Sequence, residues 1–270
     1  MAISGTKEWS VKSINCWLGC EHRCRYCYAR ANALRFGKIK SAGEWGTTYN
    51  RRSAAGGNIN RRYDGPVMFP TTHDITPATL DACLPILRAL LAKGNEILIV
   101  SKPAAAVIQR LCDRLPLTAG TGPNMAADRL RELVQFRFTI GSLDAAESAY
   151  WEPFAPPPAE RLYCLAYARY HGFRTSVSAE PLLTADVGRL IDAVDPYVTG
   201  TIWIGAMNRI RQRVIEGTDE EEIERIERLQ TPKAIRSIYE VLKDHPKIRW
   251  KESYKESLGL DRPDRPGLDT

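Results

Sequence analysis

The chain has 270 residues, of which 44% are hydrophobic and 26% charged, and it carries a formal net charge of +6 at pH 7. This composition is ordinary for a folded globular protein and excludes a disordered or fibrous chain. The first residues lack the apolar core of a signal peptide, and no apolar run approaches the ~20 residues of a membrane span, so we expect a cytoplasmic protein without membrane segments. The basic balance suits a polyanionic partner but is also common in proteins that bind no nucleic acid.

Short apolar runs alternate along the chain with longer patterns of helical period. Strands are expected over residues 11–16, 67–70, 96–101, 134–140, 174–179 and 197–205, and helices over 28–36, 77–93, 104–115, 158–171, 185–194 and 219–243. Strands separated by helices pair in parallel through right-handed crossovers, which predicts an α/β fold, either an open sheet or a full or partial barrel. The functional edge of such a sheet lies at the carboxyl ends of its strands.

Local signals set the expected boundaries. Thr231 followed by Pro232 is typical of a helix start. Residues 41–64, rich in Gly, Asn and Arg, predict a long surface excursion. We expect a barrel domain over residues 1–215 that includes this excursion, a C-terminal helical and strand extension over 216–270 packed on the barrel, and a flexible tail over 260–270.

The strongest chemical signal is the run CWLGCEHRCRYCY, which begins at the end of the first expected strand. Cys20, Cys24 and Cys27 have the spacing CxxxCxxC, and three thiolates on such a loop can hold three irons of a cubane cluster while the fourth iron stays open. The alternative is a structural zinc site, which normally uses two CxxC-like pairs. Only Cys24 and Cys27 form such a pair here, so the spacing favours iron and sulfur.

Cys16 is ambiguous, because it precedes Cys20 by the same spacing that separates Cys20 from Cys24. Tyr26, directly before the last cysteine, favours the later trio. Cys16 is then a buried residue at a strand end or a neighbour of the site. Isolated cysteines on apolar helical faces are expected to be small core residues, and these are Cys83, Cys112 and Cys164.

Three segments resemble the spore photoproduct lyase-like branch of the radical S-adenosylmethionine superfamily. They are GCEHRCRYCYAR at 19–30, WEPFAP at 151–156 with ERL at 160–162, and IWIGAMN at 202–208, which together span about residues 10–210 in the expected order. The resemblance implies a partial (β/α)6 TIM-like barrel with the cluster loop after the first strand. It also implies a [4Fe-4S] cluster on Cys20, Cys24 and Cys27.

The resemblance further implies the cofactor chemistry. The open iron would chelate the amino and carboxylate groups of S-adenosylmethionine. One electron, from a donor such as flavodoxin or ferredoxin, would then cleave the sulfonium to give methionine and a 5'-deoxyadenosyl radical that abstracts hydrogen from substrate. The protein would supply orientation and exclude water.

Further cofactor contacts are expected at the strand ends. Tyr26 lies within the cluster motif. The end of the second strand, which usually holds the methionine amine, reads Thr71, Thr72, His73 and Asp74 instead of Gly-Gly-Glu. Hydroxyl and carboxylate acceptors can do the same work, whereas the alternative is a helix-capping turn before Pro77.

Other rim residues could reach the carboxylate, ribose, adenine or substrate. Each has an alternative as a solvated charge or a cap, although a carboxylate at Glu180, beside Pro181, is hard to explain as packing. The candidates are Lys102, Ser142, Arg161, Glu180 and Asn208.

The substrate hypothesis rests on Arg-rich stretches at 51–52, 61–62 and 209–213, and on residues 247–255, where Trp250 and Tyr254 interleave with basic side chains. Basic and aromatic side chains suit phosphate contact and base stacking, although solvated loops and an edge strand explain them equally well. We expect modification or repair of a thymine-derived nucleobase in phage or mobile-element DNA, flipped into the barrel mouth. The alternatives are a peptide or small-molecule substrate, and a cluster-bearing regulator without catalysis.

Overall fold

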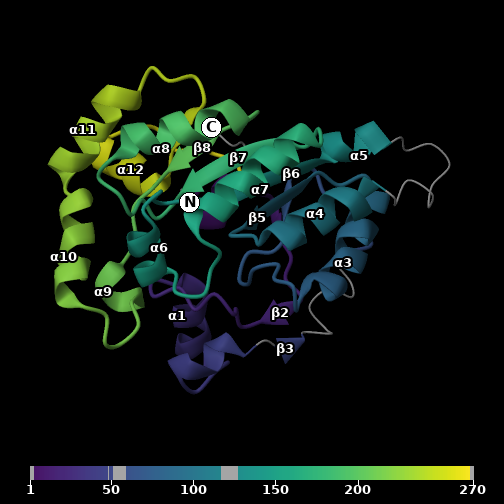
Figure 1. Ribbon diagram of the computed structural model, residues 1–270, viewed down its shortest axis with the longest axis horizontal. Coiled ribbons are helices and arrows are strands. Elements are labelled where there is room, and N and C mark those ends of the chain that lie inside the picture. The colour runs from purple at the N-terminus through teal and green to yellow at the C-terminus, as the bar shows by residue number, and fades with distance from the viewer. Residues whose placement is uncertain (1–2, 48, 51–58, 117–126, 268–270) are drawn as a thin grey trace.

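The computed structural model describes residues 3–47, 49–50, 59–116 and 127–267. Its main sheet has seven described strands, all parallel, in the order β1-β4-β5-β6-β7-β8-β9, and it curls into a half-barrel with helices on its outer face (Figure 1). The strands are β1 (Lys12–Ser13), β4 (Val67–Met68), β5 (Ile97–Ser101), β6 (Val134–Thr139), β7 (Arg174–Ala179), β8 (Ile202–Ile204) and β9 (Ile248–Trp250). The predicted α/β partial barrel is therefore confirmed.

Helices follow most strands, as the alternation predicts. The α-helices are α1 (Tyr28–Arg35), α3 (Leu80–Ala92), α4 (Ala105–Arg114), α5 (Ala127–Leu133), α6 (Ala145–Trp151), α7 (Pro158–Tyr170), α8 (Val187–Val194), α9 (Ile210–Arg213), α10 (Glu220–Leu229), α11 (Pro232–Leu242) and α12 (Glu252–Leu258). Among the described residues, the short 3-10 helices are η1 (Gly5–Glu8), η2 (Ala42–Gly46) and η4 (Asp195–Tyr197). A small antiparallel pair, β2 (Trp17–Leu18) and β3 (Tyr49–Asn50), lies beside α1 and η2.

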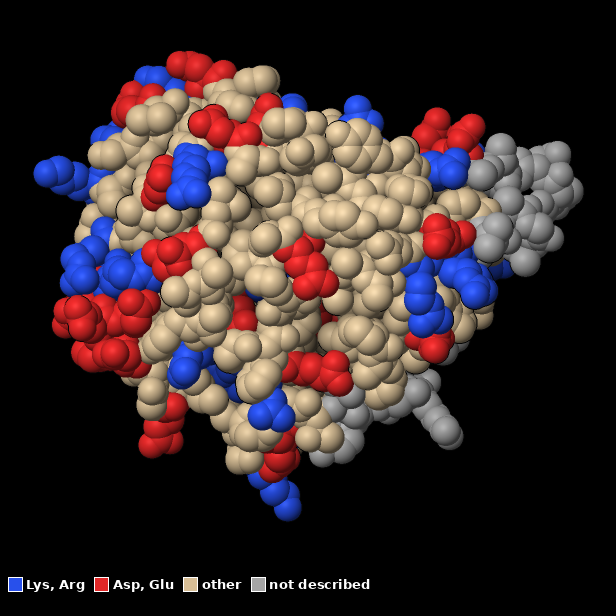
Figure 2. Space-filling view, viewed as in Figure 1, with Lys and Arg blue, Asp and Glu red and all other residues tan. Residues whose placement is uncertain are grey.

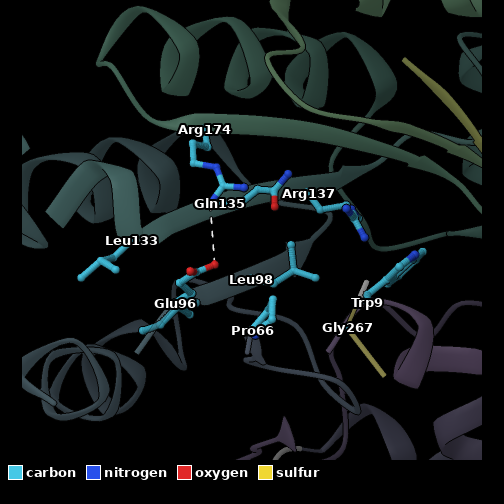
Figure 3. A pocket seen from close by; sticks show the side chains of 10 residues that line it. Trp9, Pro66, Glu96, Leu98, Leu133, Gln135, Arg137, Arg174 and Gly267 are labelled. Atoms are coloured by element: carbon cyan, nitrogen blue, oxygen red, sulfur yellow. Dashed lines mark ion pairs between the residues drawn. The ribbon is translucent and has the colours of Figure 1, made fainter. Parts of the chain in front are cut away.

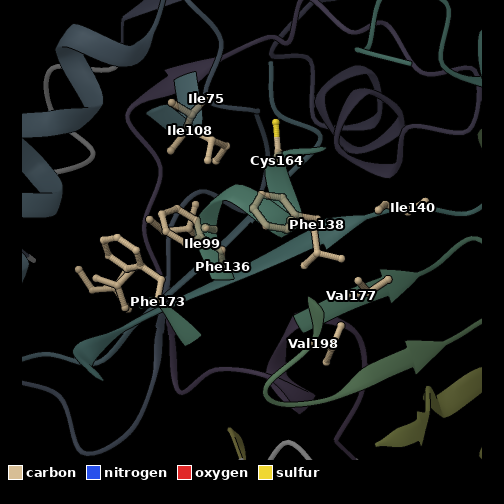
Figure 4. Close-up of a cluster of buried hydrophobic side chains, with 14 of the residues drawn as sticks. Ile75, Ile99, Ile108, Phe136, Phe138, Ile140, Cys164, Phe173, Val177 and Val198 are labelled. Carbon is tan, nitrogen blue, oxygen red and sulfur yellow. The ribbon is translucent and has the colours of Figure 1, made fainter. Parts of the chain in front are cut away.

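The main core lies between the sheet and its outer helices. Alternate residues of each strand face it, because side chains along a strand point to opposite faces. Phe136 and Phe138 of β6 stack with 5.8 Å between ring centroids, and they lie near Ile108 of α4 and Cys164 of α7 (Figure 4). These helices are held on the sheet by this apolar layer, which leaves the carboxyl ends of the strands free to form a site.

The inner face of the half-barrel is polar and aromatic. Trp9, just after η1, packs against Leu98 and Trp203 from inside the curve. The Arg137 guanidinium lies 4.6 Å from the Trp9 ring centroid, and the Lys251 ammonium lies 4.3 Å from it. The segment that begins the chain therefore fills the barrel from within.

The C-terminal segment differs in part from its prediction. The helix expected over 219–243 is two helices, α10 and α11, because the Thr231 side chain caps a new start by accepting a hydrogen bond from Ala234 N. Residues 248–250 form β9, a seventh strand at the sheet edge. Trp250, Tyr254 and Lys251 are all buried, so the expected nucleic-acid contact over 247–255 is wrong and the edge-strand alternative holds.

Other boundaries also differ. The first strand is shorter than expected and pairs only over Lys12–Ser13. The excursion over 41–64 contains η2 and β3, and its Arg51 and Arg52 lie outside the described residues. The domain division at residue 215 stays a prediction, as does the flexible tail, although Gly267 N donates a hydrogen bond to the Lys7 carbonyl at 2.9 Å. Among the described helices, none has the length and apolar character of a membrane span.

A cavity of about 220 Å³ lies at the amino-terminal ends of the strands (Figure 3). Glu96, Gln135 and Arg174 line it from the starts of β5, β6 and β7, and Glu96 pairs with Arg174 at 3.9 Å. The expected functional edge is the opposite one. This cavity is therefore separate from the cysteine loop.

Candidate functional site

The cysteine loop, residues 20–27, connects β2 to α1 at the carboxyl edge of the sheet. Cys20 N donates to the Trp45 carbonyl at 2.8 Å, and Cys27 is the residue that caps the start of α1. The buried Arg30 guanidinium holds the loop from α1 by donating to the carbonyls of Cys24 at 2.6 Å and Arg25 at 2.7 Å. The loop is thus fixed by backbone contacts, which leaves its three thiols available as ligands.

The three thiols lie close enough for their charges to act on one another, with Cys24 buried and Cys20 and Cys27 partly exposed. Burial raises the pKa of Cys20 well above its usual range, and the nearby charges of Asp74, Cys24 and Cys27 raise it further. Burial likewise raises the pKa of Cys24 to about 12, against the opposing effect of the Lys102 ammonium. Because each of these thiols disfavours ionisation of the others, a cation that all three bind would stabilise them as thiolates. The donor set therefore fits an iron-sulfur cluster.

Nowhere in the described part of the chain do three His, Cys, Asp or Glu side chains surround one point closely enough to hold a single metal ion. The assignment of a cluster to this loop therefore rests on the spacing of the cysteines, the burial of Cys24 and the charges around the three thiols.

Tyr26 lies at the centre of a buried ion network that the sequence did not reveal. Its hydroxyl donates to Glu152, a carboxylate only 1% exposed. Arg161 pairs with the same carboxylate at 2.5 Å, and the Lys102 ammonium lies 3.7 Å from it. Although burial opposes ionisation of Glu152, Arg161 and Lys102 outweigh burial and lower its pKa. The Lys102 ammonium of this network lowers the pKa of Cys24, which favours a thiolate ligand there.

Arg161 therefore does not stand open to a cofactor carboxylate. Its remaining donors reach the Pro156 carbonyl at 2.6 Å and the Thr139 carbonyl at 3.2 Å. Glu152 belongs to the WEPF segment that carried the family resemblance. Glu152 and Arg161 are nine residues apart, and the start of α7 lies between them, so their spacing in the sequence did not predict that they pair.

Asp74 joins the second strand end to the cysteine loop. One of its oxygens accepts from Lys102 N at 2.8 Å and lies 3.2 Å from His22 Nδ1, while the other accepts from Ser101 Oγ and from Ile75 N. Burial opposes ionisation of Asp74, but the charge and hydrogen bond of His22 hold its pKa well below the usual range. Asp74 is therefore neither an open acceptor nor the expected helix cap.

Thr71 and Thr72 are held by Asn15, which the sequence analysis did not single out. The Asn15 Oδ1 atom accepts from the backbone of Thr71 at 2.7 Å and of Thr72 at 2.8 Å, and Asn15 Nδ2 donates to Thr71 Oγ1 at 2.7 Å. The Tyr28 hydroxyl donates to the Thr71 carbonyl. These contacts bring the end of β4 against the start of α1.

His73 points to a different neighbour. Its Nε2 accepts from Cys16 N at 3.3 Å, and its Nδ1 lies 3.0 Å from the Asp74 carbonyl. Cys83 is a buried core residue, as expected, and its Sγ atom lies 3.7 Å from Cys16 Sγ. The Cys16 thiol thus contacts the thiol of α3.

The remaining rim candidates have partners of their own. Ser142 Oγ donates to Glu147 at 2.6 Å and accepts from Asp144 N, in a capping turn before α6. Glu180 lies 3.8 Å from Lys251, and Asn208 Nδ2 lies 3.5 Å from Glu252. Burial, then the charges of Cys27 and Glu180, raises the pKa of Tyr28, so Glu180 borders the same mouth as Cys27. Ser142 belongs to a separate turn.

Gly19 allows the loop to begin. Its φ is +95°, and an added Cβ would lie 2.2 Å from the Thr47 carbonyl oxygen. Gly37, at φ +62°, has open space around it. We expect Gly19→Ala to lower the free energy of unfolding by about 1–3 kcal/mol more than Gly37→Ala, because only the former adds a clash to backbone strain. Urea denaturation of both variants measures this, and equal losses would show that the close approach does not matter.

The fold was compared with those of known proteins. No family model matches the chain, and no curated protein matches its sequence. A spore photoproduct lyase structure with bound AdoMet and a dinucleoside spore photoproduct superposes with a TM-score of 0.54 and 13% identity, over 93% of this chain and 78% of that one. Structures of Streptococcus suis SuiB with S-adenosylmethionine and with precursor peptide SuiA give TM-scores of 0.51 and 0.53 at 8% identity, over 95% and 93% of this chain.

The chain has the fold of these radical S-adenosylmethionine enzymes. It spans about half the length of the SuiB structures, 54% and 51%. The similarity in fold covers 93–95% of this chain.

Proposed function

We propose that the chain is a radical S-adenosylmethionine enzyme with a [4Fe-4S] cluster on Cys20, Cys24 and Cys27. The observation that carries this proposal is the CxxxCxxC loop at the carboxyl edge of a half-barrel, with Cys24 buried and Cys20 and Cys27 partly exposed. When bound, the cluster and S-adenosylmethionine supply one-electron cleavage of a sulfonium and a carbon radical that abstracts hydrogen.

The chain's own residues hold this site. Arg30 fixes the carbonyls of the loop, and Glu152 holds the Tyr26 hydroxyl so that the tyrosine ring has one orientation beside Cys27. Asp74 ties His22 of the loop to the ends of β4 and β5. Tyr28, Glu180 and Asn208 border the mouth, and in this proposal they contact the cofactor or the substrate. The second-strand segment contributes through Thr71 and Thr72, which are partly exposed.

For the substrate, we propose a nucleobase in DNA, thymine-derived in keeping with the dinucleoside bound to the lyase of the same fold. Exposed Arg61, Arg62 and Arg209 could contact phosphates. On the face in Figure 2, described acidic and basic side chains alternate around α9 and α10, and Arg211 is paired with Glu220 and Glu227. A peptide is the second candidate, favoured by the SuiB structure with its precursor peptide.

Anaerobic reduction of the cluster-loaded protein with S-adenosylmethionine tests the reaction. We expect 5'-deoxyadenosine to form, even without substrate. Its complete absence would leave a cluster-bearing regulator as the better description.

A DNA-binding assay across a salt series tests the substrate class. A protein that contacts several phosphates loses affinity steeply as salt rises, because each contact releases condensed counterions. We expect such a slope, with Arg62→Ala reducing it and Arg129→Ala, on the exposed face of α5, leaving it unchanged. Binding that does not depend on salt would favour the peptide alternative.

A further inference from the structure

Cys16 and Cys83 form a buried dithiol beneath the cysteine loop that the proposed cluster does not use. Their Sγ atoms lie 3.7 Å apart, and the two residues are 4% and 0% exposed. A disulfide needs about 2 Å between the sulfurs, so from 3.7 Å the two atoms must approach by about 1.7 Å. Cys112 and Cys164 have no thiol at this distance among the described hydrogen-bond contacts, and Cys164 Sγ donates instead to the Pro103 carbonyl.

His73 lies beside this pair as a base. Its Nε2 is 3.8 Å from Cys16 Sγ, and its Nδ1 donates to the Asp74 carbonyl, which leaves Nε2 as the acceptor. The Cys83 thiol can donate to Cys16 Sγ, and this hydrogen bond, with His73 and against burial, lowers the pKa of Cys16 to about 6. A thiolate next to a second thiol is the arrangement of a reactive cysteine and its resolving partner.

We propose that Cys16 and Cys83 are an oxidative modification site, converted by hydrogen peroxide or a similarly small hydroperoxide into a disulfide. The Cys16 thiolate attacks one peroxide oxygen, the O–O bond breaks, and the proton that Cys16 gave up through His73 leaves with hydroxide as water. Cys83 Sγ then attacks the resulting sulfenic sulfur, the S–O bond breaks, and the Cys83 proton leaves with hydroxide as a second water. Two thiols lose two electrons and the peroxide gains them.

A small oxidant is required because the pair is buried, so a bulky disulfide cannot reach it. The modification joins α3 to the segment between β1 and the cysteine loop, where Cys16 N also holds His73. Cys16 has the same spacing to Cys20 as Cys20 has to Cys24, which left its role open. Its contact with Cys83, outside the loop, gives Cys16 a role separate from that of the three proposed ligands.

Peptide mapping tests the proposal. The full-length protein, prepared anaerobically with its iron, is treated with graded hydrogen peroxide, denatured, alkylated and digested. We expect a peptide pair linking Cys16 to Cys83, a mass loss of two hydrogens, and loss of alkylation at both thiols, while Cys112 and Cys164 stay alkylated. The same link is expected in iron-free protein, because neither thiol is a proposed ligand, so the result does not depend on the proposed function.

Two variants sharpen the test. Cys83→Ala should abolish the link and leave Cys16 as a sulfenic acid that a dimedone probe captures, whereas Cys112→Ala, another buried helical cysteine, should leave the link unchanged. Full alkylation of Cys16 and Cys83 at peroxide levels that oxidise the loop cysteines would overturn the proposal. A disulfide between Cys16 and Cys20 in the protein without substitutions would also overturn the proposal.

Discussion

Cys24→Ala is expected to abolish cluster binding, so that anaerobically reconstituted protein falls from about four irons per chain to below about one. Cys24 is the most buried of the three loop thiols, and the Lys102 ammonium of the Glu152 network lowers its pKa against the effect of burial. Two remaining thiolates hold a cubane on two irons only, which leaves it open to hydrolysis. Iron and sulfide analysis with visible absorption measures the loss.

The matched control for this variant is Cys112→Ala. Cys112 is buried in α4, at 4% exposure against 7% for Cys24, and it lies in the main core, outside the cysteine loop. The Cys112→Ala protein should keep its iron, and the two variants should unfold at similar urea concentrations. Full iron content in Cys24→Ala, or an equal loss in both variants, would contradict the ligand assignment.

Glu152→Leu is expected to lower the free energy of unfolding by about 3–5 kcal/mol, because it leaves buried cations without their shared carboxylate. Arg161 is 1% exposed and the Lys102 side chain 15% exposed, so neither is solvated well enough to tolerate the loss. The Tyr26 hydroxyl also loses its acceptor. Urea denaturation followed by circular dichroism measures the change.

Glu132→Leu provides the comparison, since Glu132 pairs with Arg129 at 2.8 Å with both side chains more than 60% exposed. Surface pairs contribute about 0.2–1 kcal/mol, so this variant should be near neutral. The double variant Glu152→Leu with Arg161→Met should recover part of the loss, because apolar groups of similar volume replace the ion pair. A loss in Glu152→Leu no larger than in Glu132→Leu would show that the network does not support the loop.

Local patterns predicted much of the fold. The β-then-α order gave the parallel barrel because apolar runs of strand length are visible along the chain, as in Ile97–Ser101. The seventh strand was expected only as an alternative for residues 247–255, because Ile248–Trp250 has three residues flanked by lysines and its burial depends on pairing with β8. The start of α11 was predicted from Thr231 and Pro232, whereas the end of α10 was not, because the charged pattern over 219–243 continues through both helices.

The part of the site whose residues follow one another in the sequence could be predicted. The cysteine loop is a run of eight residues, from Cys20 to Cys27, whose spacing is its signal. Glu152 and Asn15 were missed because their roles come from contacts 126 and 56 residues away in sequence. Arg161 was placed correctly near the site but given an external partner, because the sequence does not reveal which carboxylate a buried arginine meets.

The central claim is that three cysteines hold a cluster whose fourth iron binds S-adenosylmethionine. Electron paramagnetic resonance of the reduced, iron-loaded protein, recorded with and without S-adenosylmethionine, tests it most directly. We predict the rhombic signal of a reduced [4Fe-4S] cluster whose g-values shift when the cofactor is added. A signal that the cofactor leaves unchanged, or anaerobically prepared protein that carries zinc in place of iron, would contradict the account.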